Sequence, residues 1–541
     1  MKKAKVATGA LVGGISSIAL IGMFYLGRQL FDLPLVPFDL FDWLARVLPG
    51  DVITIGIDTM VSLIEALNFG STSYAAKLME QLIAASMFIF GGVGLGAGVG
   101  YLSFRTGRSG RQIGLFVGAL VFAAISLVEF SLESTEMTLV SILWIGALLL
   151  SWGLVVGVVV DVTEQDEVTE EVRASRRSIL LRVAAGSFGV AVGAWGLGRL
   201  VGVPDEELGA SQPLAPATAT PQPQITATAE ALASPELTAT VTTRDKIPPA
   251  PGTRDELTSN KDFYRIDINT FRPVLREEEW TLEVAGLFEK PTTLKLEDLM
   301  AYPIVSQPIT LNCISNLIGG DLIGTSKWTG LRLRDLLDDL GMQQGAQELM
   351  VEAADGFFES VTMMDMMDPR TLLVYGMNDE TLPVDHGFPL RIYIPNRYGM
   401  KQPKWITKIT AIDEEGSGYW VDRGWSKTAH PHVISVIDTI AKDERNPDNR
   451  IPIGGIAWAG DRGIQKVELQ FNDGDWIPAV LRVPPLGSLT WVQWRYDWDS
   501  QPGKYDIRVR ATDGSGALQI EEESGVRPNG ATGFHSKEVR V

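Results

Sequence analysis

Thiol and imidazole side chains are scarce in this chain of 541 residues, which contains one cysteine and four histidines. The single cysteine, Cys313, excludes an internal disulfide, a CxxC zinc site and a CxxCH haem attachment. The histidines are His386, His430, His432 and His535. Because the apolar first part of the chain has no histidine to hold a b-type haem, we expect no haem in this chain.

Basic residues are also in the minority. The chain has 47 Lys and Arg and 66 Asp and Glu, which gives a net charge of −19. An acidic chain argues against nucleic acid as a partner, because phosphate backbones bind basic surfaces. No internal repeat of about 20–50 residues is visible, which excludes solenoids and propellers.

Long apolar runs are abundant in residues 1–160, the predicted membrane region. Four nearly uncharged stretches, each about long enough to cross a ~30 Å hydrocarbon core, cover residues 6–26, 82–104, 113–130 and 139–160. Lysines precede the first stretch, and arginines fill "RTGRSGR" (105–111), which joins the second and third stretches. Both of these basic segments are predicted to be cytoplasmic. The acidic "SLESTEM" (131–137) is predicted to face outside. Residues 31–50 mix aromatic and Leu residues with Asp and Pro, which predicts an interfacial segment on the outer surface.

A fifth apolar segment and a polar linker follow. Within residues 161–202, "SRRSILLR" (175–182) precedes a Gly- and Ala-rich run and resembles the twin-arginine export signal. The alternative is ordinary positive-inside charge ahead of a fifth helix, and both interpretations place the rest of the chain outside. Residues 203–251 are rich in Ala, Thr and Pro, and we predict a disordered exoplasmic tether there.

The composition becomes typical of a globular protein at about residue 252. Residues 252–425 alternate strand and short helix patterns, which predicts an α+β domain. The strand patterns are "WTLEVAGLF", "PIVSQPITLNC", "LMVEAAD", "PLRIYIP" and "KWITKITAID", and the helix patterns are "KLEDLM" and "LRLRDLLDDLG". Residues 426–541 hold roughly seven strand patterns, "WIPAVLRV" among them, at the spacing of an Ig-like β-sandwich. The "MMDMMDP" run (363–369) is interpreted as a short helix with Met filling core gaps.

Two blocks carry a resemblance to a known family. They are "LNCISNLIGGDLIGTSKWTGLRLRDLL" (311–337) and "LPVDHGFPLRIYIPNRYGMKQPKWITKI" (382–409). In this order and spacing they resemble the molybdopterin-binding domain of the sulfite oxidase family, which includes bacterial relatives that reduce protein methionine sulfoxide. The all-β tail resembles that family's C-terminal Ig-like dimerisation domain, so the resemblance covers about residues 255–541.

The resemblance implies a metal ligand and a set of cofactor contacts. Cys313 matches the family cysteine whose thiolate ligates molybdenum beside the pterin dithiolene, and a soft thiolate suits this metal. His386, Arg391 and Lys404 match residues that contact the pterin and its phosphate, for which charged donors are apt. The implied cofactor-binding positions are Asn260, Tyr264, Cys313, Asn316, His386, Arg391, Tyr398, Gly399, Lys401 and Lys404.

The resemblance also implies a substrate pocket, and here the chain departs from sulfite oxidases. Arg265 falls where the family has an arginine at the oxo-anion pocket, and Trp425 stands near the place of an active-site tyrosine. With Cys313 these two are the predicted catalytic residues. The arginine that follows the cysteine in sulfite oxidases is missing, and Arg423 and Lys327 are candidates to compensate. These departures weaken the case for sulfite itself as the substrate.

These observations predict a membrane-anchored molybdenum oxidoreductase that transfers an oxygen atom, with two electrons, on a sulfite- or sulfoxide-like substrate. Its catalytic half is expected outside the cell membrane, so electrons pass to or from a separate cytochrome or membrane redox protein. The tail implies a homodimer, with packing on the membrane region as the alternative. Two other classes stay open: a non-catalytic binding or scaffold protein that retains the fold, and a membrane sensor centred on the helices.

Overall fold

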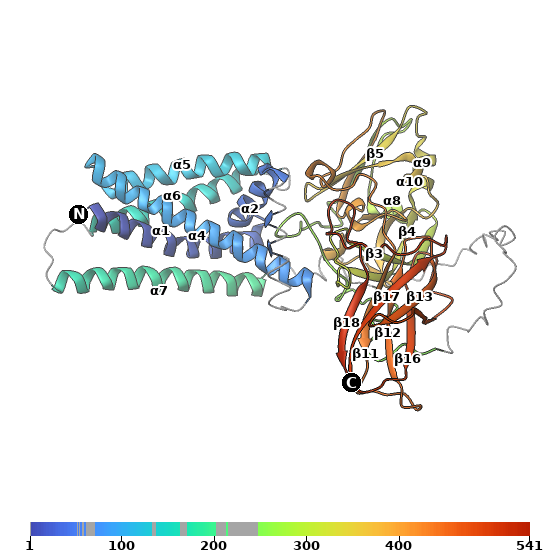
Figure 1. Ribbon diagram of the computed structural model, residues 1–541. Helices are drawn as coiled ribbons and strands as arrows, with labels where there is room; N and C mark the ends of the chain where they lie inside the picture. The colour runs from blue at the N-terminus through green and yellow to red at the C-terminus, as the bar shows by residue number, and fades with distance from the viewer. Residues whose placement is uncertain are drawn as a thin grey trace. The chain divides into compact units, whose positions relative to one another are not determined.

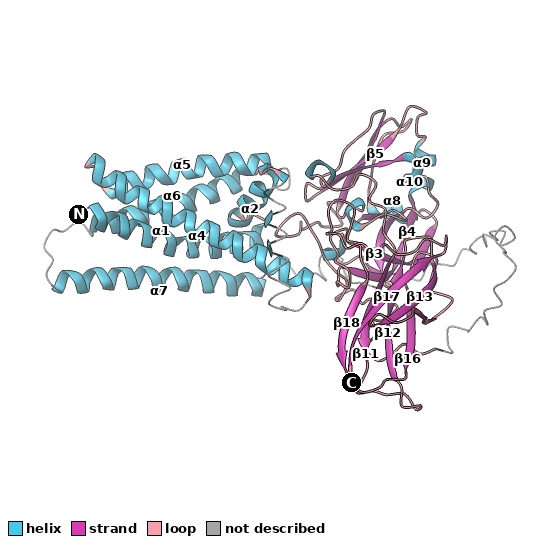
Figure 2. Ribbon diagram, in the orientation of Figure 1, coloured by secondary structure: helices cyan, strands magenta, loops and turns pink. Residues whose placement is uncertain are grey.

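The computed structural model divides the chain into two compact units. The helical unit comprises Met1–Gly70, Tyr74–Pro204 and Asp267–Pro273, and the β-rich unit comprises Ser71–Ser73, Asp205–Ile266 and Val274–Val541. Figure 2 shows the long helices of the first unit in cyan and the strands of the second in magenta. The structure describes residues 2–50, 52, 55–56, 59–60, 71–132, 137–162, 170–201, 213–214 and 247–541.

The labelled helices of the helical unit follow the apolar pattern of the sequence (Figure 1). They are α1 (Lys2–Phe31), α2 (Val36–Val47), α4 (Thr72–Thr106), α5 (Gly110–Ser131), α6 (Leu139–Val162) and α7 (Glu170–Val201). All except α2 are long and apolar enough to cross a membrane, and each contains one of the five predicted apolar segments. Helix α2 has 12 residues, which is too short to span a membrane, and the interfacial position of this segment stays a prediction.

Small residues let the long helices approach one another closely. A Cβ added to Gly13 of α1 would touch the backbone of Gly92 and Gly96 in α4. A Cβ added to Gly114 of α5 would likewise touch the backbone of Gly153 in α6. Glycines at four-residue spacing on facing helices are typical of membrane bundles, where close backbone packing contributes to helix association in place of the hydrophobic effect.

The first half of the β-rich unit contains two sheets and three short α-helices. One sheet has the strand order β2-β1-β10-β5-β6, and the other has the order β3-β4-β7-β8, with β9 paired to β7. The strands are β1 (Leu282–Gly286), β2 (Thr292–Leu294), β3 (Ile304–Asn312), β4 (Ile323–Arg332), β5 (Glu348–Ala353), β6 (Phe358–Thr362), β7 (Leu372–Met377), β8 (Glu380–Thr381), β9 (Arg391–Tyr393) and β10 (Ile406–Ile412). The helices are α8 (Leu296–Met300), α9 (Leu333–Leu340) and α10 (Met363–Met366). Both sheets contribute to one buried core with the leucines of α9, as an α+β fold requires.

The second half consists of two four-stranded sheets. Their orders are β11-β12-β16-β15 and β14-β13-β17-β18. The strands are β11 (Ile434–Ile440), β12 (Ile451–Trp458), β13 (Ile464–Phe471), β14 (Ile477–Pro478), β15 (Val480–Leu481), β16 (Val492–Trp498), β17 (Lys504–Asp513) and β18 (His535–Arg540). Ile453 and Trp494 of the first sheet share a core with Leu469 and Val509 of the second, so the sheets pack face to face. The predicted β-sandwich is present, and its Ig-like identity stays a prediction.

Two features of the strands differ from the sequence predictions. "WIPAVLRV" is not one strand, because β14 pairs with β13 and β15 pairs with β16, so the chain changes sheets between them. Strands β4 and β7 are not among the predicted strands, although each pairs with neighbours on both sides. The short helices α8, α9 and α10 are confirmed.

Some predictions concern residues that the structure does not describe. Part of the acidic loop (133–136) and most of the tether (203–251) lie outside the described residues. Arg176 and Arg177 of the twin-arginine motif belong to helix α7, but their side chains are not among those described. The acidic loop, the tether and the export motif therefore stay predictions.

Candidate functional site

The loop after strand β3 holds Cys313 in a ring of hydrogen bonds. The Cys313 N–H donates to the Leu322 carbonyl at 2.9 Å, and the Asn316 N–H donates to the Cys313 carbonyl at 3.1 Å. The Leu322 N–H in turn donates to Asn316 Oδ1 at 3.0 Å. Asn316, a predicted cofactor contact, therefore uses its amide oxygen inside the loop, where it fixes the backbone around the cysteine.

The Cys313 thiol is buried, with 7% of the residue exposed, and its Sγ lies 3.0 Å from Ser315 Oγ. Burial raises the pKa of the thiol, whereas hydrogen bonding from Ser315 and the positive charge of Lys404 act in the opposite direction. The sulfur is thus withdrawn from water but kept near a cation. This setting suits a thiolate that is stabilised by a bound metal.

Tyr264 and Gly399 lie beside this loop. Burial raises the pKa of Tyr264, the nearby Cys313 raises it further, and the charge of Arg391 lowers it. A Cβ added to Gly399 would lie 2.8 Å from Tyr264 Oη and 3.6 Å from the Asn312 carbonyl oxygen. Two predicted cofactor contacts from distant parts of the sequence therefore meet next to the residue that precedes Cys313.

His386 ends the short 3-10 helix η3 (Val384–His386) and is buried, with 4% exposed. Its Nε2 lies 2.8 Å from the Asn260 carbonyl, which can only accept, so Nε2 carries the proton. Burial lowers the pKa of His386 to about 4; the bond to Asn260 and the charge of Asp385 raise it, and the charges of Lys404 and Arg391 lower it. The imidazole is therefore neutral at neutral pH.

Arg391 and Lys404 converge on aromatic rings beside this histidine. The Arg391 guanidinium lies 4.7 Å from the Trp328 ring centroid, and the Lys404 ammonium lies 4.3 Å from that of Trp405. A Cβ added to Gly387, which has φ +114°, would lie 3.0 Å from Lys404 Cβ and 3.1 Å from Arg391 Cβ. Glycine at this position lets the two cationic side chains lie together.

Arg265 is bound at the edge of this group. Its Nη1 lies 2.9 Å from Oδ1 of Asp385, the residue before His386. Asp385 was not predicted as a site residue, although it lies within the second sequence block. The Asn260 Nδ2 donates to Glu380 Oε2 at 3.1 Å, so the side chain of this predicted contact is engaged by a carboxylate.

The Lys401 side chain has a different partner from the one expected. Its ammonium lies 2.6 Å from Glu359 Oε1, and the two side chains are 3% and 0% exposed. Burial opposes ionisation of Glu359 and raises its pKa, and the Lys401 charge lowers it. A predicted contribution of Lys401 to cofactor binding therefore depends on its backbone, in the 3-10 helix η4 (Gly399–Lys401).

A third group of residues connects the Cys313 loop to the chain's last strands. Trp425 is buried in a core that it shares with Ile314 and Tyr398. The guanidinium of Arg527 lies 4.9 Å from the Trp425 ring centroid. The Trp425 Nε1 has no hydrogen-bond partner among the described residues. A buried indole N–H beside a guanidinium is a suitable place for an anion.

The two residues proposed to compensate for the missing arginine, Arg423 and Lys327, have different partners. Arg423 stacks on Tyr419 at 3.6 Å from the ring centroid, and Lys327 pairs with the exposed Asp379 at 2.6 Å. Arg527 was not predicted at all. Its only signal in the sequence is an arginine within the Gly- and Pro-containing stretch "GVRPNG" (525–530), which belongs to neither block.

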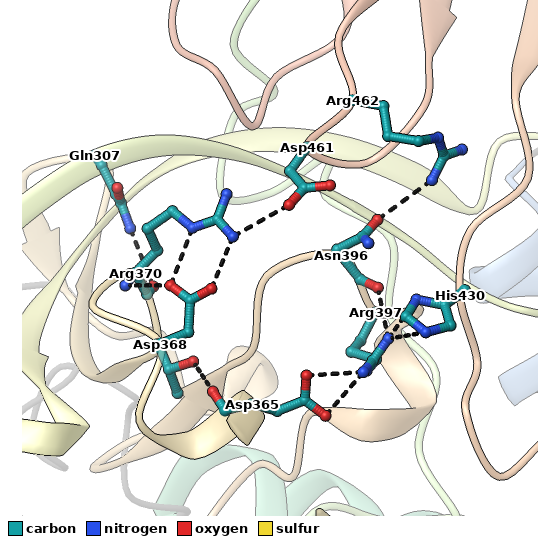
Figure 3. Close-up of polar contacts among 10 residues, drawn as sticks. Gln307, Asp365, Asp368, Arg370, Asn396, Arg397, His430, Asp461 and Arg462 are labelled. Atoms are coloured by element: carbon teal, nitrogen blue, oxygen red, sulfur yellow. Dashed lines mark hydrogen bonds and ion pairs between the residues drawn. The ribbon is translucent and has the colours of Figure 1, made fainter. Parts of the chain in front are cut away.

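A polar network holds the loop that follows β9 (Figure 3). Arg397 Nη2 donates to both carboxylate oxygens of Asp365, at 2.7 and 2.8 Å, and its Nη1 lies 2.6 Å from His430 Nε2. The preceding Asn396 accepts from Arg462 at 3.5 Å. The predicted contacts at Tyr398 and Gly399 are therefore carried by a loop that is anchored from several sides.

The donor set fits an anionic, phosphate-bearing cofactor. Arg391 and Lys404 lie together beside a neutral His386, and the buried Asn312 Oδ1 has no hydrogen-bond partner among the described residues. Unused buried polar atoms of this kind are expected where a polar ligand binds. Cys313 adds the soft ligand that molybdenum prefers.

Comparisons with known proteins agree with this site. Residues 269–420 match the family model described as "Oxidoreductase molybdopterin binding domain". Mitochondrial sulfite oxidase of Drosophila melanogaster is 28% identical over 327 residues, which cover 50% of this chain and 57% of that protein. Sulfite oxidase of Arabidopsis thaliana is 27% identical, covering 40% and 68%. An NADH nitrate reductase of Oryza sativa subsp. japonica is 28% identical, covering 45% and 34%.

The chain therefore spans little more than half the length of the fly sulfite oxidase and about a third of the rice nitrate reductase. Among solved structures, a chain of the sulfane dehydrogenase SoxCD from Paracoccus pantotrophus has a TM-score of 0.46 at 20% identity. The match covers 55% of this chain and 87% of that one.

Proposed function

We propose that this chain, a molybdopterin-dependent oxidoreductase whose residues 269–420 belong to the sulfite oxidase family, transfers oxygen atoms to or from a small oxo-anion or sulfoxide. The observation that supports this best is a buried Cys313 thiol within electrostatic reach of Lys404 and Tyr264, with Arg391 acting on Tyr264 and lying beside Lys404. A molybdenum cofactor bound by these residues supplies the two-electron redox chemistry.

Each residue of the site has a separate task in this proposal. Cys313 provides the thiolate ligand, and the Asn316 ring keeps its backbone in place. Arg391 and Lys404 bind the anionic end of the cofactor through charge-assisted hydrogen bonds. His386, held neutral by burial and fixed by its bond to the Asn260 carbonyl, presents its Nδ1 as an acceptor for a pterin N–H.

The proposed reaction exchanges one oxygen atom between substrate and water. A sulfoxide-like substrate that loses its oxygen takes up two electrons and two protons and releases water, and a sulfite-like substrate runs the same balance in reverse. Arg265 and Arg527 bind the substrate's negative oxygen, and the Trp425 N–H donates to it. A separate electron-carrier protein delivers or removes the electrons.

Replacement of Cys313 by serine tests the ligand role. Serine is nearly isosteric, so we expect the fold to persist, turnover to be lost and the metal's absorption bands to change. Ser315→Ala is a matched control, because it removes the hydroxyl that lies 3.0 Å from the sulfur but keeps the thiolate. The protein should come from cells that make the pterin, with molybdenum counted per chain. Wild-type protein without molybdenum, or a serine variant with an unchanged spectrum, would contradict the proposal.

The proposal also places the catalytic half outside the cell membrane. It is supported by the distribution of Lys and Arg around the five apolar helices. Protease added to sealed, right-side-out cells should cut within residues 203–251, so that residues 252–541 run as a separate fragment on a denaturing gel. If that portion stays intact until the cells are lysed, the orientation is wrong.

A further inference from the structure

A short segment near the middle of the chain belongs to the helical unit. Asp267–Pro273 directly follows Tyr264 and Arg265, yet it packs with α2 and the beginning of α4. The Phe271 ring lies 4.8 Å from the Phe38 ring of α2 in an edge-to-face arrangement. The chain thus leaves the β-rich unit after Ile266, enters the helical unit and returns at Val274.

One carboxylate of α2 is committed to this segment. The Thr270 N–H donates to Asp42 Oδ1 at 3.0 Å and Oδ2 at 3.1 Å, and the Thr270 hydroxyl donates to Oδ1 at 2.7 Å. Asp42 is 7% and Thr270 1% exposed, so water is excluded from these bonds. A buried threonine with both donors satisfied by one side chain is a specific contact, because loss of the acceptor would leave both donors unpaired.

Two cations bind the same segment from either side. Arg46 Nη2 of α2 donates to Asn269 Oδ1 at 2.9 Å. Lys77 Nζ of α4 donates to the Asn269 carbonyl at 2.8 Å and to the Asp267 carbonyl at 3.2 Å. Asn269 is 8% exposed. A passive linker would leave such polar groups in water, so their burial with matched partners indicates docking.

We propose that α2 and the beginning of α4 form a latch that binds Asp267–Pro273 and thereby positions the cofactor-contacting residues just before it. Thr270 follows Arg265 by five residues, which extend at most about 18 Å. Release of Thr270 therefore removes one of two restraints on the stretch that carries Tyr264 and Arg265, the other being its contacts within the β-rich unit. Asp42 is a positioning residue in this scheme, because it acts through Thr270. The latch stands on its own contacts, and only its positioning role rests on the proposed function.

Hydrogen–deuterium exchange of the full chain in lipid nanodiscs tests the latch. Asp42→Leu removes both acceptor oxygens, so exchange in the peptide that contains Thr270 should become at least ten-fold faster. Asp42→Asn keeps one carbonyl acceptor and should stay within three-fold of wild type. Asp39→Leu, one turn earlier on α2, is the control, because the Asp39 side chain bonds to the backbone of Leu35, the residue before α2, whereas Thr270 bonds to Asp42. Exchange in α9 shows whether each variant has folded.

The second readout is the site itself. With Asp42→Leu we expect at least a three-fold loss of bound molybdenum per chain or a three-fold rise in KM, and Asp42→Asn should restore both. Equal exchange in wild type and Asp42→Leu, or an equal effect of Asp39→Leu, overturns the latch. Faster exchange with unchanged molybdenum content, KM and kcat overturns the positioning role. Failure of the proposed function can be told apart from failure of the latch. If the proposed function is wrong, wild-type protein carries no molybdenum and the positioning role is wrong as well. The difference in exchange between wild type and Asp42→Leu would still be observed.

Discussion

At Gly319, next to the turn of the Cys313 loop, the fold leaves no room for a side chain. The residue has φ +87°, and a Cβ there would fall on the imidazole of His535, within 2.5 Å of its Cδ2. The ring cannot easily move away, because its Nδ1 accepts from the Ile437 N–H at 3.0 Å. The need for glycine here is explained by packing against β18, which carries His535.

Gly319→Ala should therefore destabilise the chain for two reasons. A positive φ costs alanine about 1–2 kcal/mol, and the collision with His535 adds a further strain. Gly516→Ala separates the two, because Gly516 has φ +89° with nothing within 4 Å of an added Cβ. Thermal unfolding of the full chain in detergent should show a clearly larger loss for Gly319→Ala. Equal losses would mean that the His535 contact has no energetic weight.

The candidate site was predictable where its residues lie in a sequence block and not where they depend on tertiary contact. Cys313, Arg391 and Lys404 lie in the two blocks, and the structure brings them together. The partner of Lys401 could not be predicted, because Glu359 lies on a strand with no motif. Arg527 was missed for the same reason: only the folding of the tail brings it to Trp425.

The turn between β12 and β13 contributes charged residues that bind the first half of the β-rich unit (Figure 3). Arg370 Nη2 lies 2.7 Å from Asp368 and 3.1 Å from Asp461 of that turn. Arg462 Nε lies 2.7 Å from Asp513, and its Nη2 donates to the Pro431 carbonyl at 3.0 Å. Asp461 thus joins the sandwich to Arg370, and Arg462 joins it through Asn396 to the loop that carries Tyr398 and Gly399.

Arg462→Ala should loosen this junction. It removes the bonds to Asn396 and Pro431 and leaves the carboxylate of Asp513, 1% exposed, without its guanidinium partner. We expect a loss of about 2–3 kcal/mol in the free energy of unfolding. Lys504→Ala is the control, because Lys504 and Glu538 are each 68% exposed and such pairs contribute below about 1 kcal/mol. Similar losses for the two variants would contradict a special role for the turn.

Some strands were predictable from the sequence and others were not. Strands with alternating or β-branched patterns, such as β10 and β13, were recognised. Strand β4 was missed, because its Gly, Ser, Thr and Lys residues hide a fully paired position between β3 and β7. In "WIPAVLRV" the apolar pattern continues across a change of sheet, since hydropathy reports burial and not the pairing partner.

Across the chain, hydropathy was the sequence property that predicted helices most reliably. All five predicted apolar segments are helical, because about 20 apolar residues in sequence allow few other structures. No pattern in the sequence predicts that Asp267–Pro273 joins the helical unit, since the segment lies within the globular composition that begins at about residue 252. Sequence order alone would therefore assign this segment to the wrong unit.

Every histidine of the chain lies in its second half, and burial lowers the pKa of each. Through its histidines, the folded β-rich unit binds fewer protons than the unfolded chain below pH 6.5, so the histidines make the fold less stable as the pH falls. For His386, the pKa falls from 6.5 to about 4. The stability that this histidine contributes is fully present above pH 6.5 and is lost as the pH falls toward 4.

We therefore expect His386→Gln to flatten the dependence of stability on pH. The shift predicts that wild type loses about 2 kcal/mol through this residue between pH 7 and pH 5, and glutamine cannot titrate. The comparison must be made against wild type at each pH, because burial raises the pKa of Glu359 to about 7 and acts in the opposite direction. Denaturant unfolding of the full chain at pH 5, 6 and 7 measures both curves. Parallel curves for the two proteins would show that His386 is solvated or protonated in the fold, and the neutral acceptor assigned to it would have to be abandoned.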